Sequence, residues 1–245
     1  MKKMSFLSRE FASAFKDGDF ERAHKLVKAG ADMHNTIIEL DDGHSYRVME
    51  YAVANGLFDH IKALISMGYN INDRDDTGKT AVFIAINNID HTVLTEVLKY
   101  KPDLNLRYKD MGGYYATGRL FHKAENTTVL MQACYISRLR TIKKLLKRGA
   151  DANAQDSCGF TPLMYLALRY FIPELTCNTS FGLPVYKEAE EILHTEYFEG
   201  IEEKDLAPIA QALIKAGADV NIRNKFSKTA KNLAALSSVL YRVLE

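Results

Sequence analysis

Five segments of the chain share one pattern, in which two adjacent aliphatic residues are followed a few residues later by Asp or Asn, and in four of them a glycine lies between. Paired aliphatics of this kind end the apolar stripe of an amphipathic helix, and the glycine can take the left-handed conformation that closes it. These glycines are Gly30, Gly68, Gly149 and Gly217. In the third segment Lys101 stands before Pro102, and because proline restricts the residue before it, we expect that helix to end differently.

A second pattern predicts where a helix begins in each repeated unit. A threonine, whose hydroxyl can cap free backbone amides, is followed in most copies by a small residue five places on, which lets a neighbouring helix approach. The expected helix starts are Arg47, Thr80, Thr128, Thr161 and Thr229. A short polar residue suited to a tight turn follows each helix end, at His34, Asn72, Asn105, Asn153 and Asn221.

Together the two patterns resemble the T-P-L-H-x-A and L-L-x-x-G-A-D-x-N signatures of the ankyrin repeat. One such repeat has about 33 residues and consists of a turn and two antiparallel helices. The resemblance runs from about Phe6 to Glu245, but Thr-Pro occurs only once, at Thr161. No copy carries the family's histidine, which is replaced by Glu50, Phe83, Met131, Met164 and Asn232.

The resemblance implies an all-α fold, a solenoid of stacked helix-turn-helix units with projecting β-hairpin fingers. We expect one domain, 1–245. Its expected units are about 6–35, 36–73, 74–106, 124–154 and 155–222, with a C-terminal cap at 223–245.

Irregular spacing between the helix ends indicates insertions. About five extra residues lie between His34 and Arg47, and a finger insertion occupies 106–123. Its mixture of Tyr, Arg and Gly is typical of recognition surfaces, although an extended hairpin folded over its neighbours is the alternative. An insertion between two helices occupies 170–205, where residues 187–205 carry eight acidic groups against two lysines.

Charge and composition narrow the function classes. The chain has 32 basic and 31 acidic residues, and residues 1–123 and 124–245 are each close to balance, so general nucleic-acid binding is disfavoured. A basic run from Arg138 to Arg148 follows an apolar helical stripe, and ordinary amphipathicity is the favoured interpretation. The N-terminus does not resemble a signal peptide, and no apolar run is long enough to cross a bilayer. The three cysteines lack C-x-x-C spacing, which favours free thiols and therefore a location in the cytoplasm.

No catalytic or metal motif stands out, so we expect no enzyme activity and no cofactor. Cys158, Cys177 and His194 form a weak alternative as metal ligands. A second function class is an enzyme or ligand-binding site built by the 170–205 insertion, with Glu190, Glu191 or His194 as acid or base.

The leading hypothesis, carried over from the family, is a monomeric module that binds another protein through a concave face and its fingers, with no nucleic acid or membrane partner. The degenerate repeats favour a microbial or viral protein. Two alternatives remain open for its role: a host-directed effector that acts in a host cytoplasm, and an inhibitor of a toxin. The candidate partner-binding residues are Tyr51, Asn55, Arg74, Asp76, Lys79, Asn87, Tyr108, Tyr114, Tyr115, Arg119, Gln132, Tyr135, Asp156, Phe160, Tyr165 and Arg169.

Overall fold

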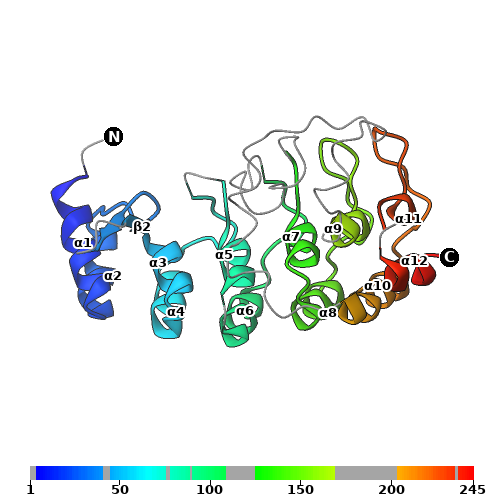
Figure 1. Cartoon of the computed structure of the whole chain (residues 1–245). Coiled ribbons are helices and arrows are strands. Elements are labelled where there is room, and N and C mark those ends of the chain that lie inside the picture. Colours follow the sequence, from blue (N-terminus) through cyan, green and yellow to red (C-terminus); the bar gives the residue numbers. More distant parts are fainter. Residues whose placement is uncertain are drawn as a thin grey trace. The chain divides into compact units, whose positions relative to one another are not determined.

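The computed structural model describes residues 4–40, 45–75, 78–88, 90–108, 125–168, 203–234 and 237–245. The chain divides into two compact units, Met1–Asp103 (unit 1) and Leu104–Glu245 (unit 2). The described residues are mostly helical, as expected, and the elements follow the chain as successive pairs of short helices (Figure 1).

The described residues of unit 1 form three helix pairs and one short hairpin. Its elements are α1 (Phe6–Lys16), α2 (Phe20–Lys28), β1 (Ile37–Glu39), β2 (Ser45–Arg47), α3 (Val48–Ala54), α4 (Phe58–Ser66), α5 (Ala81–Asn87), α6 (His91–Val97) and the 3-10 helix η1 (Leu98–Tyr100). Within each pair the two helices pack together, and α3 packs against α5 while α4 contacts α6. The core of unit 1 includes the buried side chains of Phe11, Phe15, Ile61, Leu64 and Leu94.

The hairpin accommodates the extra residues of the first finger. Strands β1 and β2 pair antiparallel, with Ile37 opposite Arg47 and Glu39 opposite Ser45. Ile38 between them is 2% exposed. This is where the spacing between His34 and Arg47 predicts a lengthened finger.

Unit 2 repeats the arrangement. Its elements are α7 (Val129–Tyr135), α8 (Leu139–Lys147), α9 (Pro162–Leu168), the 3-10 helix η6 (Glu203–Asp205), α10 (Leu206–Lys215), α11 (Ala230–Leu233) and α12 (Ser238–Val243). First helices α7, α9 and α11 pack in sequence order, and so do second helices α8, α10 and α12. A single bridge, with the Tyr108 N–H donating to the Thr127 carbonyl at 3.0 Å, joins the two described ends of the finger insertion.

The helix ends confirm the local predictions, with one correction. Gly30, Gly68, Gly149 and Gly217 all have left-handed φ values, between 87° and 103°. Lys101 also takes this conformation, at φ 51°, although we expected the Lys-Pro sequence to avoid it. The helix does end differently, because α6 first tightens into η1.

The turn asparagines join successive repeats. The Asn72 side-chain oxygen accepts from the Asp103 N–H at 2.8 Å in unit 1. In unit 2 the Asn105 and Asn153 oxygens accept from the N–H groups of Asp151 and Asp219 at 2.9 and 2.7 Å. Each junction therefore satisfies a turn amide that would otherwise depend on water.

Candidate functional site

Three fingers are closed by the same side-chain device. In each finger a side-chain Oδ1 accepts from the backbone N–H four residues further on, at 2.8 to 3.0 Å. The pairs are Asp75 with Lys79, Asp156 with Phe160, and Asn224 with Lys228. The backbones of the same residue pairs are also hydrogen bonded, at 2.8 to 3.1 Å. A short polar acceptor at this position therefore holds each finger tip without help from a partner.

The fingers of unit 2 also bond to one another. The Ser157 N–H donates to the Glu125 carbonyl at 2.8 Å, and the Lys225 N–H donates to the Cys158 carbonyl at 2.9 Å. Gly159 lies at the second contact, where an added Cβ would come within 3.0 Å of the Asn224 backbone. Close approach of the backbones, together with a φ of 83°, explains the glycine.

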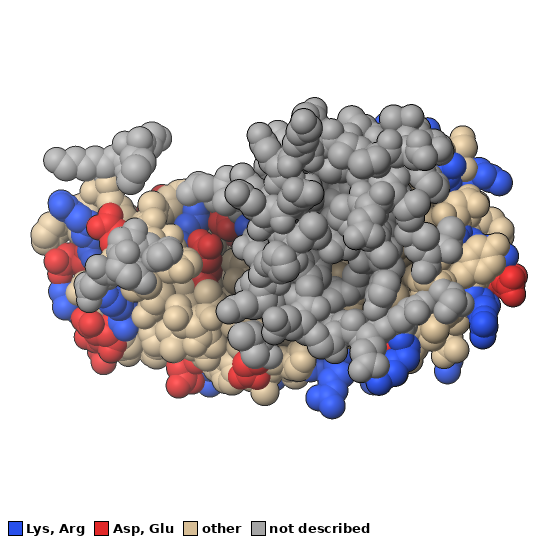
Figure 2. Space-filling model, in the orientation of Figure 1, with Lys and Arg blue, Asp and Glu red and all other residues tan. Residues whose placement is uncertain are grey.

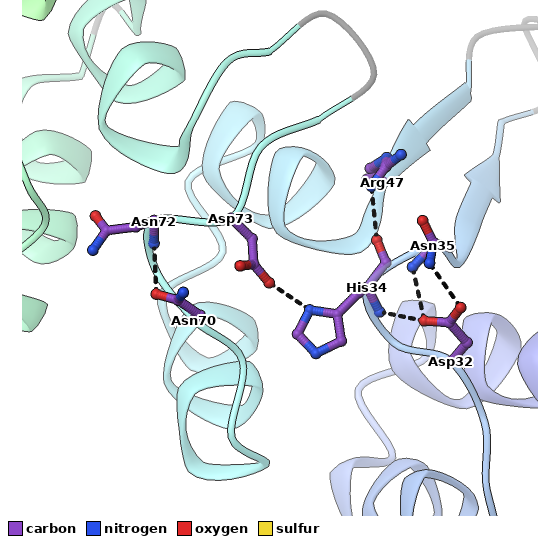
Figure 3. Close-up of polar contacts among 7 residues, drawn as sticks. All are labelled: Asp32, His34, Asn35, Arg47, Asn70, Asn72 and Asp73. Carbon is purple, nitrogen blue, oxygen red and sulfur yellow. Dashed lines mark hydrogen bonds and ion pairs between the residues drawn. The ribbon is translucent and has the colours of Figure 1, made fainter. Parts of the chain in front are cut away.

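At the first repeat junction of unit 1 a histidine replaces the bridging asparagine (Figure 3). The His34 Nδ1 lies 2.5 Å from an Asp73 carboxylate oxygen, and its ring stacks on Tyr69 with centroids 5.0 Å apart. Its backbone is held on both sides, since its N–H donates to Asp32 at 3.0 Å and its carbonyl accepts from the Arg47 guanidinium at 3.1 Å. We call His34 and the residues it contacts, together with Glu50, the first-junction cluster. The contacting residues are Asp32, Arg47, Tyr69 and Asp73.

Burial makes the first-junction cluster electrostatically unusual. Burial, and then the neighbouring Asp75 carboxylate, raise the pKa of Glu50 above its ordinary value. Burial and the Asp73 carboxylate raise the pKa of Tyr69 to about 12, so its hydroxyl stays neutral. The hydrogen bond from the Asn35 amide lowers the pKa of Asp32. The cluster thus brings acidic groups together with the Arg47 guanidinium at the first repeat junction.

Five candidate partner-binding residues of unit 1 lie at least partly on the surface. Asn55 and Arg74 are exposed, and Tyr51, Lys79 and Asn87 are half-buried. They come from α3, from α5 and from the finger between these helices, which is residues 73–80.

The six described candidates of unit 2 lie in its core. They are Tyr108, Gln132, Tyr135, Asp156, Phe160 and Tyr165, all at most 7% exposed. Asp156 and Tyr165 bond to each other, the Tyr165 hydroxyl donating at 2.8 Å. We expected these side chains on the surface, whereas the structure buries them; Tyr165, for example, contacts Asp156 and Phe160 of the preceding finger.

Comparisons with known proteins agree with this geometry. The family model for ankyrin repeats matches residues 130–170, which contain nearly all of α7 and the whole of α8 and α9. The chain is also 26% identical, over 64% of its length, to a putative ankyrin repeat protein of Escherichia coli, 69% of which is covered. These two matches support an ankyrin-repeat family for the chain. The chain is also 28% identical, over 93% of its length, to a putative palmitoyltransferase of Danio rerio, and spans only 32% of that protein.

Three departures from the ankyrin-repeat signature converge in space. Glu50 occupies the place of the family's histidine, Arg47 that of the threonine, and His34 that of the turn asparagine. These three residues meet at the first-junction cluster, where the Arg47 N–H donates to Glu50 at 3.4 Å. Sequence reasoning treated them as loose matches. Their occurrence around a single junction was the signal that could have identified the cluster.

Several predictions concern parts of the chain outside the described residues. They include the candidates Asp76, Tyr114, Tyr115, Arg119 and Arg169. Glu190, Glu191, His194 and Cys177, on which the alternative enzyme and metal sites depend, fall there too.

The described ranges contain neither a candidate metal cluster nor a candidate membrane-spanning helix. No group of three or more His, Cys, Asp or Glu side chains there could hold a metal ion. In the same ranges, every helix is too short or too polar to cross a membrane.

Proposed function

We infer that this chain is a non-enzymatic protein-interaction module that binds its partner through the first helices and fingers of unit 1. The observation that carries this proposal is the partly exposed polar set on α3 with its C-cap, on α5 and on the finger at 73–80, which we call the finger face. Its described members are Tyr51, Asn55, Arg74, Lys79 and Asn87.

Local contacts hold the finger face before any partner arrives. The Asn55 and Asn87 amides donate to the carbonyls of Tyr51 and Phe83 at 2.9 and 3.0 Å. The Arg74 guanidinium donates to the Gly78 carbonyl at 3.2 Å within its own finger. Since these side chains are already ordered, binding would cost little further conformational entropy.

The finger face offers complementary chemistry for a protein loop or strand. A guanidinium such as that of Arg74 carries five N–H donors suited to carbonyls and carboxylates, and the Asn55 carboxamide oxygen can accept from a backbone N–H. Half-buried Tyr51, with its ring 6.4 Å from that of His60, provides apolar area beside them. Aromatic and arginine side chains of this kind are enriched among the residues that dominate binding energy.

Site-specific photo-crosslinking would test this function directly. A benzoylphenylalanine residue at Asn55 should give one defined crosslinked protein in lysate of the source organism, or of its host. The same residue at Lys62, exposed on the second helix α4, is the matched control and should not give that product. Equal crosslinking at both positions would contradict binding at the finger face.

The purified partner then allows a quantitative test. Replacing Arg74 and Lys79 together by Ala should weaken binding by about tenfold or more, because two side chains of the face are removed. The pair Lys28→Ala and Lys62→Ala removes the same charge from exposed second-helix positions and should change the Kd by less than about twofold. The partner's identity would also separate the alternatives, since a host protein indicates an effector and a toxin indicates an inhibitor.

A further inference from the structure

The second helix α8 of unit 2 is basic along its whole length. It contains Arg140, Lys143, Lys144 and Lys147, it has no acidic residue, and Arg148 follows at its C-cap. Four of these five side chains are exposed, and Lys144 is half-buried. Figure 2 shows Lys and Arg gathering along the lower edge of unit 2, where Figure 1 places α8 and α10.

The exposed cations form a regular stripe. Arg140, Lys143 and Lys147 follow spacings of three and four residues, which place them on one side of the helix, about 4.5 and 6 Å apart along its axis. Buried Ile142 and Leu145 occupy the opposite side. We call the stripe, together with Arg148, the α8 basic face.

A neighbouring helix widens the α8 basic face. Helix α10 packs against α8. Its exposed Lys215 stands at the repeat position that Lys147 occupies one repeat earlier. The turns after these two helices are joined, since the Asn153 amide donates to the Gly217 carbonyl at 2.8 Å. Lys215 therefore adds a cation on the next helix of the same layer.

The α8 basic face differs from α2 and α6 of unit 1, whose carboxylates balance neighbouring lysines. On α2 the Lys25 ammonium pairs with Glu21 at 2.6 Å, and beside α6 Lys99 pairs with Glu96 at 2.5 Å. Among the described residues, no carboxylate forms an ion pair with Arg140, Lys143, Lys147 or Arg148. Like charges three and four residues apart destabilise a helix, and carboxylates from outside would relieve that repulsion.

The division into two units reveals a charge asymmetry that the near-neutral whole chain hides. Residues 104–245 carry 19 basic and 15 acidic groups, whereas residues 1–103 carry 13 and 16. The basic excess therefore belongs to the unit that contains α8. A long-range attraction for acidic partners would act on this unit.

The chemistry favours a protein ligand over a nucleic acid. Sites for single-stranded nucleic acids combine cations with aromatic side chains on which bases stack, and α8 contains no aromatic residue. A helix with carboxylates at spacings of three and four matches the stripe in both period and rise. We propose that the α8 basic face binds an acidic helical segment of a partner protein. This surface belongs to second helices of unit 2, whereas the finger face belongs to first helices and a finger of unit 1.

Binding of a designed peptide to the whole chain tests the proposal. The probe is a labelled helical peptide of about 20 residues with glutamates at spacings of three and four along one face. A second peptide of the same composition has its glutamates distributed around the helix. Fluorescence anisotropy should show the first binding more tightly than the second, with an affinity that falls as salt rises.

Charge-reversal variants locate the contact. Lys143→Glu with Lys147→Glu should weaken binding of the first peptide by about tenfold. Lys28→Glu with Lys62→Glu changes the net charge equally on exposed second helices of unit 1 and should have less than about a twofold effect. Unchanged circular dichroism and Tm would exclude unfolding as the cause.

Three results would overturn the proposal. The first is no binding of the acidic peptide by the intact chain, and the second is an equal loss in both double variants. The third is tighter binding of polyuridylate with the same number of negative charges, which would make the α8 basic face a nucleic-acid surface.

Discussion

The side-chain oxygen of Asn153 accepts a hydrogen bond at 2.7 Å from the backbone N–H of Asp219, 66 residues further along the chain. The Asn153 amide also donates to the Gly217 carbonyl. Two consecutive repeat turns are therefore held together although the inter-helix insertion separates them in sequence. The insertion leaves this junction with the same contacts as the one formed by Asn105.

Replacing Asn153 by Ala should lower the free energy of unfolding by about 1 to 2 kcal/mol, because two hydrogen bonds between repeats are lost. Asn221→Ala is the matched control. Asn221 occupies the same repeat position in the last turn, and its side chain makes no hydrogen bond to any described residue. Urea unfolding followed by circular dichroism measures both. Equal destabilisation of the two variants would show that the bridge contributes nothing beyond the turn itself.

Asp156 should be among the most sensitive positions of unit 2. Its carboxylate accepts from the Cys158 and Phe160 N–H groups and from the Tyr165 hydroxyl, each at 2.8 Å. Asp156→Ala leaves these buried donors unsatisfied and should cost about 3 kcal/mol or more.

The isosteric change Asp156→Asn should be much milder. Asn224 closes the next finger with an amide oxygen, so an asparagine can hold both backbone N–H groups. We expect a cost of about 1 kcal/mol from weakening of the Tyr165 contact. Chemical denaturation of both variants provides the comparison, and similar costs for Ala and Asn would refute this role of the side chain.

Glu50→Gln should stabilise unit 1 at neutral pH. Because folding raises the pKa of Glu50, the folded state favours the protonated carboxyl. That contribution is fully present below the ordinary pKa of glutamate and is lost as the pH rises through the raised value. Glutamine stays neutral throughout, so the variant should gain stability over the natural chain as the pH increases through this range.

Thermal unfolding of both proteins from about pH 4 to pH 7 tests the sign. The difference in Tm should be small at the acidic end and should grow toward neutrality. Glu39→Gln, on the exposed end of β1, serves as the control. A difference in Tm that is independent of pH would argue against burial of the Glu50 charge as the cause.

The two described cysteines should differ in reactivity. Cys134 is fully buried, and burial raises the pKa of its thiol. Cys158 is half-buried, with a pKa raised by burial and then by Asp156. In native buffer Cys134 should react with iodoacetamide about a thousandfold more slowly than Cys158, because only opening of the fold exposes it. Peptide mass mapping over time measures both rates, and comparable rates would mean that α7 is not packed as described.

Local chemistry made part of the fold predictable. Gly149, in the left-handed conformation, ends α8. Thr128 caps α7, because its hydroxyl accepts from the Met131 N–H at 3.4 Å. Lys101 shows the limit of such reasoning, since the packed repeat holds it in the left-handed conformation that its sequence disfavours.

The candidate surface was less predictable than the fold. Tyr51 and Tyr165 occupy equivalent positions in the repeat, yet Tyr51 is half-buried and Tyr165 is 1% exposed. Tyr165 is covered because Phe160 and Asp156 of its own finger pack against it. No periodic pattern carries that information.

The sequence by itself determined where the helices begin and end and which residues turn the chain, because capping and backbone conformation depend on residues only a few positions apart. Only the tertiary structure decided which side chains face solvent and which meet across a junction. His34 and Asp73 are 39 residues apart, and their contact exists only because two repeats stack in one register. The charge imbalance between the two units likewise became visible only when the contacts within the fold divided the chain at Asp103.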